Sequence, residues 1–349
     1  MRIETIRQRL REHGAKAGHE QRVLRLWACA LSQHSGKRKP EDFLPQTVRA
    51  MLPALVDELA GLARLRSEHP AADGSSRLLV ELADGQAVES VLLPRAGLCV
   101  STQLGCAVGC VFCMTGRDGL LRQLGSAEIV AQVVLARRQR AVRKVVFMGM
   151  GEPAHNLDNV IEAIEVLGTA GGIGHKNLVF STVGDLRVFE QLPRATVKPA
   201  LALSLHSTKA ELRARLMPRA PRIAPAELVA QGERYARATG YPIQYQWTLL
   251  AGINDGDDEL DGIVELLRGK YALLNMIPYN TVAGLTFERP SHQRSEAIAR
   301  TLLRRGVLTK LRQSAGQDVE GGCGQLRARA RAAPVRVVTL QRGAAAAPA

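Results

Sequence analysis

The chain has 349 residues and a formal charge of +14, because 47 lysines and arginines stand against 33 aspartates and glutamates. Its 46% hydrophobic and 23% charged residues exclude a disordered chain, and its length allows about two domains or one large α/β barrel with an appendage. No run of about 20 apolar residues is present to span a membrane, and residues 1–7 contain no apolar signal core, so we expect a cytoplasmic protein without membrane contact.

The positive charge is typical of proteins that bind a polyanion, because lysines and arginines release counterions from phosphate backbones. The chain is also rich in alanine and arginine throughout. A basic protein without such a partner is therefore the alternative, and charge alone favours nucleic acid without identifying it.

Residues 1–70 show apolar residues at helical spacing and few signals of strands. This pattern is carried by Ile6, Leu10, Val23, Leu26 and Leu55. We predict a small helical N-terminal domain over 1–70. Residues 71–97 are predicted to form a β-hairpin extension, because the pair Asp84-Gly85 is a strong turn signal.

Three of the six cysteines lie within eight residues. Cys106, Cys110 and Cys113 form the pattern C-x3-C-x2-C, with no further cysteine or histidine close behind. Structural zinc takes four protein ligands, and a cubane iron–sulfur cluster takes one ligand per iron. Three thiolates leave one iron of such a cluster free to hold a small molecule, so the loop predicts an iron–sulfur site.

Helices and strands alternate from the cysteine loop to residue 312. Helices are predicted at 126–140, 159–167, 225–239, 259–269 and 295–305, with Ser126 as the N-cap of the first and Glu128 in its first turn. Strands are predicted at 145–148, 178–180, 200–205, 244–250, 273–277 and 309–312. This alternation indicates βαβ units around a parallel sheet. About six units over residues 98–326 predict a barrel or partial barrel, with function at the carboxyl ends of its strands.

The remaining segment, 327–349, contains five arginines, an alanine run and no acidic residue. We predict a disordered tail there, and we favour a solvated extension over an RNA contact.

Five short motifs together resemble one enzyme family. They are LCVSTQLGC at 98–106, GMGEP at 149–153, SLH at 204–206, LMP at 216–218 and GCGQL at 322–326. The three-cysteine pattern at the first strand of a barrel resembles the radical S-adenosylmethionine (radical SAM) superfamily. The flanking motifs resemble its RlmN/Cfr family, whose members methylate an adenine in RNA. The resemblance runs in register from about residue 78 to 326, and it implies an α/β fold with a radical SAM partial (β/α)6 barrel and an N-terminal domain that assists RNA binding.

The resemblance implies a role for each matching residue. Cys106, Cys110 and Cys113 would bind a [4Fe–4S] cluster, whose open iron takes the amino and carboxylate groups of S-adenosylmethionine (SAM). The positions that contact SAM in the family are occupied here by Gly151, Glu152, Ser181, Ser204, Leu205, His206 and Asn280. Cys323 matches the cysteine that is methylated, Cys99 matches its redox partner, and Glu89 matches the proton acceptor.

In the mechanism so implied, one SAM molecule methylates Cys323 and a second is cleaved reductively to a 5′-deoxyadenosyl radical. The radical takes hydrogen from the methyl group, and the carbon then adds to adenine at C2, or at C8 as the alternative. Loss of a proton to Glu89 and attack by Cys99 would release the product and leave a transient Cys99–Cys323 disulfide. The implied partners are ribosomal or transfer RNA and a reductant such as a flavodoxin or ferredoxin, for a monomeric enzyme.

Each candidate also has a structural alternative. Cys99 fits a small buried side chain, His206 a hydrogen-bonded core residue, and Glu89 a solvated residue of the hairpin. Glu152 before a proline fits the cap of a turn, and the basic run at 137–144 fits an exposed helix end. An iron–sulfur or zinc protein that binds RNA without catalysis also stays open at this point. A radical activase is disfavoured, because it has no need of paired cysteines outside the cluster loop.

Three features depart from the family pattern. The residues after Asn280 are Thr281-Val282-Ala283-Gly284, without the proline-rich continuation that is frequent in the family. The strand at 178–180 continues as Ser181-Thr182-Val183-Gly184, with valine where the family commonly has a second serine. The first 70 residues match the family only loosely. These departures leave the radical chemistry in place and leave the RNA target open.

Overall fold

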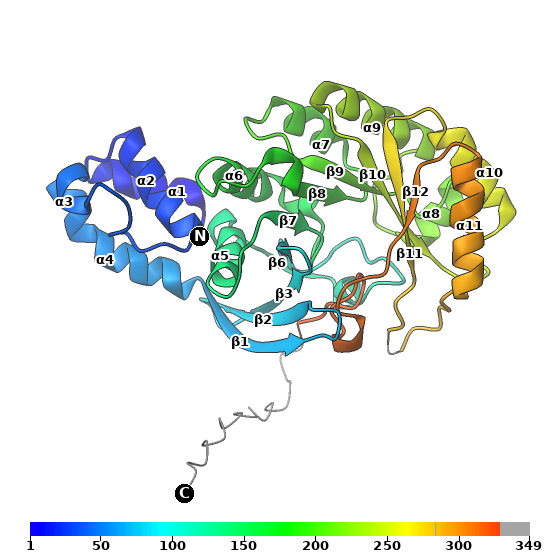
Figure 1. The fold of residues 1–349 in the computed structure, drawn as a ribbon, viewed down its shortest axis with the longest axis horizontal. Coiled ribbons are helices and arrows are strands. Elements are labelled where there is room, and N and C mark those ends of the chain that lie inside the picture. The colour runs from blue at the N-terminus through cyan, green and yellow to red at the C-terminus, as the bar shows by residue number, and fades with distance from the viewer. Residues whose placement is uncertain (283, 329–349) are drawn as a thin grey trace, which may run out of the picture.

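The computed structural model describes residues 1–282 and 284–328. The helical N-terminal unit is present as predicted, at one end of the elongated molecule (Figure 1). Its helices are α1 (Ile3–Glu12), α2 (Ala17–Ala28), α3 (Pro40–Phe43) and α4 (Gln46–Gly61). The five apolar residues that predicted it are all buried. The predicted tail lies, from residue 329 onward, outside the described residues.

The helical segment is shorter than predicted. It ends at Gly61, and Ala63–Pro70 forms strand β1, which pairs antiparallel with β2 (Ser76–Leu82). β2 pairs in turn with β3 (Ala87–Leu93) across the predicted turn at Asp84-Gly85. The extension therefore has three strands, not two. β1 was missed because it is a largely exposed edge strand, so its polar sequence lacks the alternating apolar residues that mark a half-buried strand.

The predicted partial (β/α)6 barrel is confirmed by the order and direction of the strands. Seven strands run parallel, and β3 pairs antiparallel with the first of them, so that the extension and the barrel share one ten-stranded sheet. The parallel strands are β4 (Gly97–Cys99), β7 (Lys144–Phe147), β8 (Leu178–Thr182), β9 (Ala200–Ser204), β10 (Ile243–Leu249), β11 (Ala272–Pro278) and β12 (Thr309–Leu311). The sheet starts at β1 and ends at β12, so the barrel is open.

Six strand–helix units precede β12, and their helices lie around the outside of the curved sheet (Figure 1). The helices are α5 (Ser126–Arg137), α6 (Leu157–Gly168), α7 (Leu186–Gln191), α8 (Ala210–Leu216), α9 (Pro225–Thr239), α10 (Asp257–Leu267) and α11 (His292–Arg304). Sequence periodicity missed α7, α8 and the small sheet of β5 (Gln103–Gly105) and β6 (Leu120–Gln123), because each is too short to show a repeat.

A final described segment, residues 313–328, leaves β12 and crosses back toward the β1–β3 extension (Figure 1). We call it the C-terminal strap. It contains one 3-10 turn, Gln317–Val319, and it carries Cys323. Its course brings the end of the described chain beside residues more than two hundred positions earlier, as in the 2.7 Å hydrogen bond from the Arg327 amide to Glu89.

The beginning of α5 differs from the prediction in one residue. Gly125, not Ser126, is the N-cap, and Ser126 is the first helical residue. The glycine is required by a close approach, because a Cβ at position 125 would lie 2.0 Å from the Met1 carbonyl oxygen. The Ser126 hydroxyl is used instead to fasten α1, since it accepts a hydrogen bond of 2.8 Å from the Ile3 amide.

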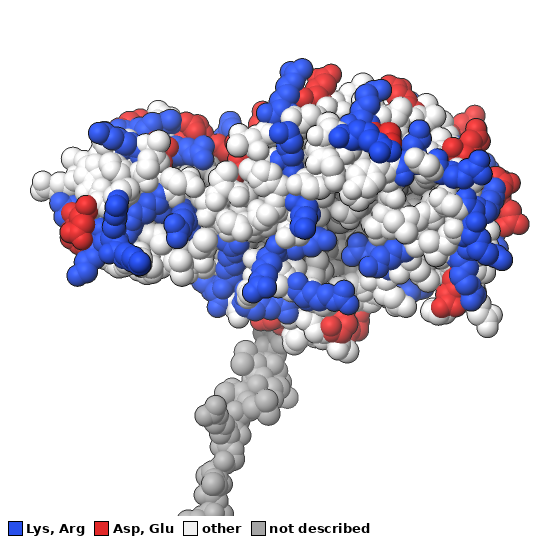
Figure 2. Space-filling view, turned by 45° about the horizontal axis from the view of Figure 1, so that its top comes forward, with Lys and Arg blue, Asp and Glu red and all other residues white. Residues whose placement is uncertain are grey.

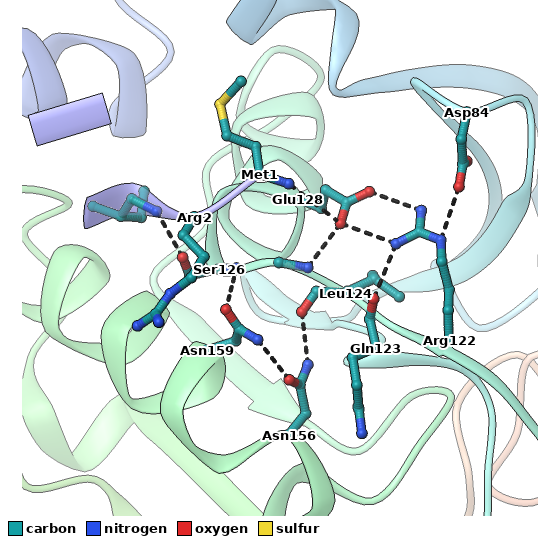
Figure 3. Close-up of polar contacts among 12 residues, drawn as sticks. Met1, Arg2, Asp84, Arg122, Gln123, Leu124, Ser126, Glu128, Asn156 and Asn159 are labelled. Carbon is teal, nitrogen blue, oxygen red and sulfur yellow. Dashed lines mark hydrogen bonds and ion pairs between the residues drawn. The ribbon is translucent and has the colours of Figure 1, made fainter. Parts of the chain in front are cut away.

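A polar network surrounds this helix start (Figure 3). The Glu128 carboxylate accepts from the Gly125 amide at 2.7 Å and pairs with Arg122 at 2.8 Å. Arg122 also pairs with Asp84 in the hairpin turn at 2.8 Å. The first turn of α5 therefore ties the barrel to the extension and, through Ser126, to the N-terminal unit.

We expect Ser126→Ala to lower the free energy of unfolding by about 1–3 kcal/mol, because the substitution leaves the Ile3 amide without its acceptor. Chemical denaturation measures the change. Thr169→Ala is the matched control, since it removes an exposed hydroxyl that only bonds back to Glu165 within α6 and its free energy should change by less than about 0.5 kcal/mol. Equal effects of the two substitutions would contradict the role assigned to Ser126.

Candidate active site

The three clustered cysteines lie on a loop between β5 and the 3-10 turn Met114–Gly116. The loop starts with a close approach of two backbone segments, because a Cβ on Gly105 would lie 2.0 Å from the Gly119 carbonyl oxygen. Backbone hydrogen bonds fix the rest of it, from Val111 to the Leu216 carbonyl at 3.0 Å and from Met114 to the Gly324 carbonyl at 2.8 Å. The loop is thus held between the α8 end and the C-terminal strap.

The thiols of this loop lie near one another and are sheltered from water. Burial raises the pKa of Cys106 to about 12 and raises the pKa values of Cys110 and Cys113. Cys113 raises the pKa of Cys106 further, and Cys106 and Cys113 raise that of Cys110. A cavity of about 260 Å³ opens beside Cys110 and Cys113 and is also lined by Arg117 and Arg219. Thiols in such surroundings ionise when they bind a metal, and the two arginines offset the resulting negative charge.

This arrangement fits a polynuclear cluster better than a single ion. Within residues 1–282 and 284–328, no three His, Cys, Asp or Glu side chains converge closely enough to hold one metal ion. A cubane cluster does not need that convergence, because each of its irons takes its own thiolate. Cys106, Cys110 and Cys113, with the cavity beside them, match that donor set.

Glu152 follows β7 and is buried beside the cysteine loop. Its carboxylate accepts hydrogen bonds of 3.1 Å from the amides of Ala154 and Val183. Burial raises its pKa to about 7, and no lysine, arginine or histidine of the described chain forms an ion pair with it. A buried carboxylate without a cationic partner is suited to bind the ammonium group of a ligand. The alternative of a turn cap is also met, because the Glu152 side chain caps the 3-10 turn Pro153–Asn156.

Gly151 lets the chain reach this position. Its φ is +104°, and a Cβ there would lie 2.6 Å from the Gln103 Cβ. Gln103 itself accepts a 2.7 Å hydrogen bond from the Glu152 amide. The glycine therefore allows the loop after β7 to pack against β5, which places Glu152 opposite the cysteines.

The carboxyl ends of β8 and β9 supply four further candidates. Ser181 lies in β8 and Ser204 ends β9, and both are partly exposed. The Leu205 side chain is fully buried, so only its backbone is available to a ligand. His206 has a left-handed φ of +59°, and its Nδ1 accepts from the Thr248 amide at 2.9 Å. Burial, together with the charge of Arg213, lowers the pKa of His206 to about 3, which keeps the ring neutral.

Asn280 and Cys323 are brought together by the C-terminal strap. The Asn280 amide nitrogen donates to the Cys323 carbonyl at 2.9 Å and to the Ser314 hydroxyl at 2.8 Å. The amide oxygen of Asn280 is buried and has no hydrogen-bond partner among the described residues. A buried acceptor of this kind is costly unless a ligand donor satisfies it. Asn280 therefore fits a residue that both fixes the strap and contacts a bound molecule.

Cys99 and Cys323 lie close enough for one thiol to affect the ionisation of the other. Cys99 ends β4 and is buried, whereas Cys323 is exposed on the strap. Burial raises the pKa of Cys99, and the neighbouring Cys323 raises it further. Cys323 also raises the pKa of Cys113. The strap thus places Cys323 within electrostatic reach of both Cys99 and the cysteine loop.

Glu89 is not the solvated hairpin residue that its strand pattern favoured. It is 1% exposed, pairs with Arg77, and accepts from the Arg327 amide at 2.7 Å. Burial raises its pKa, and Arg77 opposes that shift. β3 is covered on both faces, by the barrel and by the strap. Its alternating sequence pattern therefore wrongly favoured a solvent-exposed Glu89.

Sequence reasoning missed several residues that position the site. Arg213 of α8 is buried and pairs with no carboxylate in the part of the chain that the structure describes. It donates to the carbonyls of Val183 and Ser204 and lies near Cys110. Ser101 donates to the Glu89 carbonyl at 2.5 Å and accepts from the Met150 amide at 2.8 Å. Ser101 matched a family motif but gave no signal of this bridge. Arg213 gave no signal either, because the short helix α8 that carries it was not predicted from the sequence.

Basic side chains are spread over one face of the molecule (Figure 2). Figure 2 shows them over the N-terminal helices and around a hollow in the barrel part of the face. Two members of the basic run 137–144 have structural contacts, since Arg137 donates to the Ala28 carbonyl at 2.6 Å and Arg140 to the Leu93 carbonyl at 2.8 Å. Across the described residues, no helix is both long enough and apolar enough to cross a bilayer.

Comparisons with known proteins agree with this geometry. Residues 100–267 match the model of the radical SAM superfamily. The chain is 74% identical to a "Probable RNA methyltransferase" of Leptothrix cholodnii, over 98% of each chain, and 77% identical to one of Methylibium petroleiphilum, over 95% of this chain and 94% of the relative. A solved radical SAM methyltransferase from Sphaerobacter thermophilus is 33% identical, with a TM-score of 0.80 over 94% of this chain and 98% of its own.

Proposed function

This chain belongs to the radical SAM methyltransferases, and on that premise we propose that it methylates a ring carbon of adenine in RNA, with C2 as the carbon modified. The superfamily implies a [4Fe–4S] cluster and SAM. The observation that carries the finer proposal is the position of Cys323, which lies near a buried second thiol on one side and the cysteine loop on the other. A cysteine that carries a methyl group needs the SAM site near it to receive the group, and a second thiol near it to break the C–S bond after transfer.

The residues take the following roles in this proposal. Cys106, Cys110 and Cys113 hold the cluster. Glu152 pairs with the ammonium of SAM, and the neutral His206 and the free oxygen of Asn280 offer it polar contacts. The remaining SAM contacts come from Gly151, Ser181, Ser204 and the backbone of Leu205.

When bound, the cluster and SAM supply a methyl group and a 5′-deoxyadenosyl radical. Cys323 accepts the methyl group on its sulfur and presents the carbon to the base. Glu89 accepts the proton that the base loses. The unpaired electron of the adduct would return to the cluster. The Cys99 thiolate then attacks the Cys323 sulfur, so that an S–S bond forms as the C–S bond breaks. The electron pair of the C–S bond stays with the carbon, which takes a proton from solvent to become the methyl group of the product. Reduction by a flavodoxin or ferredoxin returns both thiols, and such a transient disulfide suits the reducing cytoplasm. We propose that the enzyme works there as a monomer.

Mass spectrometry of adenosines tests the proposed product. Ribosomal and transfer RNA from a deletion strain are compared with RNA from the same strain carrying the gene again. We expect 2-methyladenosine to be lost on deletion and restored with the gene, and the affected RNA fraction identifies the target. Loss of 8-methyladenosine instead would replace C2 by C8, and an unchanged nucleoside profile would refute RNA methylation.

RNA binding draws support from a basic cavity in the N-terminal unit, which we propose as an RNA-binding accessory domain. The cavity, of about 390 Å³, is lined by Arg22, Arg25, Lys37 and Arg38, and the described residues that line it include no carboxylate. Phe43 closes one side of it, with Arg38 stacked 5.8 Å from the ring centre. Cations beside an aromatic ring are typical of surfaces that bind nucleic acid strands.

We expect the logarithm of RNA affinity to fall linearly with the logarithm of salt concentration, because each bound phosphate releases counterions. Substituting the exposed Arg25 and Lys37 together with alanine should reduce the slope by about two, one for each phosphate that then goes unbound. Filter binding between about 50 and 200 mM salt measures both slopes. Lys270→Ala, which removes an exposed lysine from the loop between α10 and β11, is the control. A slope that the double substitution leaves unchanged would place the RNA elsewhere.

A further inference from the structure

The C-terminal strap is fastened to the β1–β3 extension mainly by side chains of the extension. Near its start, the Gly316 amide donates to the Asp73 carboxylate at 3.1 Å. Near its end, the Arg327 amide donates to the Glu89 carboxylate at 2.7 Å. Cys323 lies between these two points, so its position depends on contacts that the extension makes on either side.

Arg77 of β2 contacts both the strap and Glu89. Its Nε donates to the Val319 carbonyl at 2.6 Å, and its Nη1 pairs with the Glu89 carboxylate. The guanidinium side chain is 18% exposed and the Glu89 side chain 2% exposed, so the pair is largely shielded from water. A planar guanidinium can make these two contacts at once because its N–H groups point in fixed, different directions.

We propose that Arg77 is a positioning residue, which holds the Glu89 carboxylate and the Cys323-bearing strap in one fixed arrangement. This inference rests on the proposed roles of Glu89 and Cys323 in methyl transfer. Arg77 touches neither the base nor SAM; it acts through the two groups that it fixes. One side chain thereby couples the proton acceptor to the carrier of the carbon.

The charges around Glu89 set the direction of the expected pH effect. Burial raises the pKa of Glu89, the charge and hydrogen bond of Arg77 and the Arg327 amide lower it, and Glu320 of the strap raises it. A proton acceptor works only when ionised, so activity rises with pH through its pKa. Loss of the Arg77 charge removes the largest opposing effect and moves this rise to higher pH.

Two substitutions separate the two contacts. Arg77→Lys keeps the positive charge but loses the forked geometry, so it should keep the pH profile and loosen the strap. Arg77→Gln loses the charge as well, so it should loosen the strap and move the acidic limb upward by about one pH unit or more. Arg66→Gln is the control, because Arg66 is an exposed residue of the neighbouring strand β1.

The position of the strap is tested without catalytic turnover, through the equilibrium of the Cys99–Cys323 disulfide. The reconstituted proteins are equilibrated anaerobically with reduced and oxidised glutathione, and the Cys99–Cys323 disulfide is quantified by peptide mass spectrometry. Each disulfide formed oxidises two protein thiols and converts one oxidised glutathione into two reduced molecules. We expect both Arg77 variants to lower the equilibrium constant for this disulfide about 5- to 10-fold, and Arg66→Gln to leave it unchanged.

The pH profile of product formation is measured on the same four proteins. The inference is supported when both Arg77 variants weaken the disulfide and only Arg77→Gln shifts the acidic limb. It is overturned if the disulfide equilibrium of both variants equals that of the unsubstituted protein, or if the activity of Arg77→Gln falls by the same factor at every pH. A protein that never methylates RNA would refute the proposed function, yet the disulfide equilibrium would still decide whether Arg77 positions the strap.

Discussion

Replacing Cys99 with alanine is expected to yield a protein that carries covalently attached RNA. If Cys323 transfers its carbon through a bond to the base, a second thiol must break the C–S bond. Cys99 ends β4 and is the thiol outside the cluster loop that interacts with Cys323. Its removal should leave the cluster, SAM cleavage and RNA binding intact and stop the cycle at release. Turnover should fall by several orders of magnitude, because no other described thiol is placed to replace it.

The adduct is detected as a shift on a denaturing gel that ribonuclease removes, and mass spectrometry then locates it on Cys323. Cys323→Ala should show no adduct, since it has no sulfur to accept the methyl group. Cys29→Ala is the matched control, because Cys29 caps α2 in the N-terminal unit, far along the chain from both thiols. A Cys99→Ala protein that turns over normally and stays free of RNA would show that Cys99 is only a core residue.

The release step should also depend on pH. Burial raises the pKa of the Cys99 thiol, so little thiolate is present at neutral pH until a neighbouring group takes the proton. The thiolate is the nucleophile in thiol–disulfide chemistry. Single-turnover release should therefore accelerate as pH rises, in the same direction as the ionisation of Glu89 and over a higher range.

Substituting Cys110 with alanine is expected to abolish the iron–sulfur cluster. The Cys110 thiol lies with Cys113 beside the 260 Å³ cavity, and Cys106 precedes them on the same loop. Three thiolates are the fewest that can hold three irons of a cubane. Anaerobic reconstitution followed by iron and sulfide analysis measures the loss, and SAM cleavage should disappear with it. Cys29→Ala should retain a full cluster.

A second result would separate loss of the cluster from loss of the fold. The Cys110→Ala protein should keep its far-ultraviolet circular dichroism and its RNA affinity, because the loop contributes only part of the smaller apolar core around Val108 and Phe112. Full iron and sulfide in this variant would mean that other residues hold the cluster. Such a result would overturn the site while leaving the superfamily assignment in place.

Two parts of this molecule could be predicted from the sequence: the repeated strand–helix units and the loop of three reactive cysteines. The parallel strands from β7 to β11 are recognisable as short apolar runs because both faces are covered. The spacing of the three cysteines predicts an iron–sulfur site, because few other structures need three thiols within eight residues. These signals are local, and a single sequence contains them.

The contacts that were missed depend on segments far apart in the chain. Nothing near Glu89 shows that Arg327 will cover it, and nothing near Arg213 shows that its guanidinium will be buried against two strand ends. β1 was missed for a different reason, since an exposed edge strand needs no apolar alternation. Chain crossings and edge strands are set by tertiary packing, which leaves no periodic pattern in the sequence.

The sharing of β4 between the extension and the barrel has a consequence for motion at the site. Cys99 pairs with Val91 of β3 on one side and with Val146 of β7 on the other. Glu89, Cys99 and the loop that leads to Glu152 therefore lie on three adjacent strands of one sheet. Strands within a ladder open only with a large part of the fold, whereas a segment held by a few side chains opens at low cost. The described strap residues join no strand ladder. Breaking the strap's contacts with Asp73, Arg77 and Glu89 would therefore displace Cys323 without opening the sheet, so that Glu89, Cys99 and Glu152 would keep their spacing.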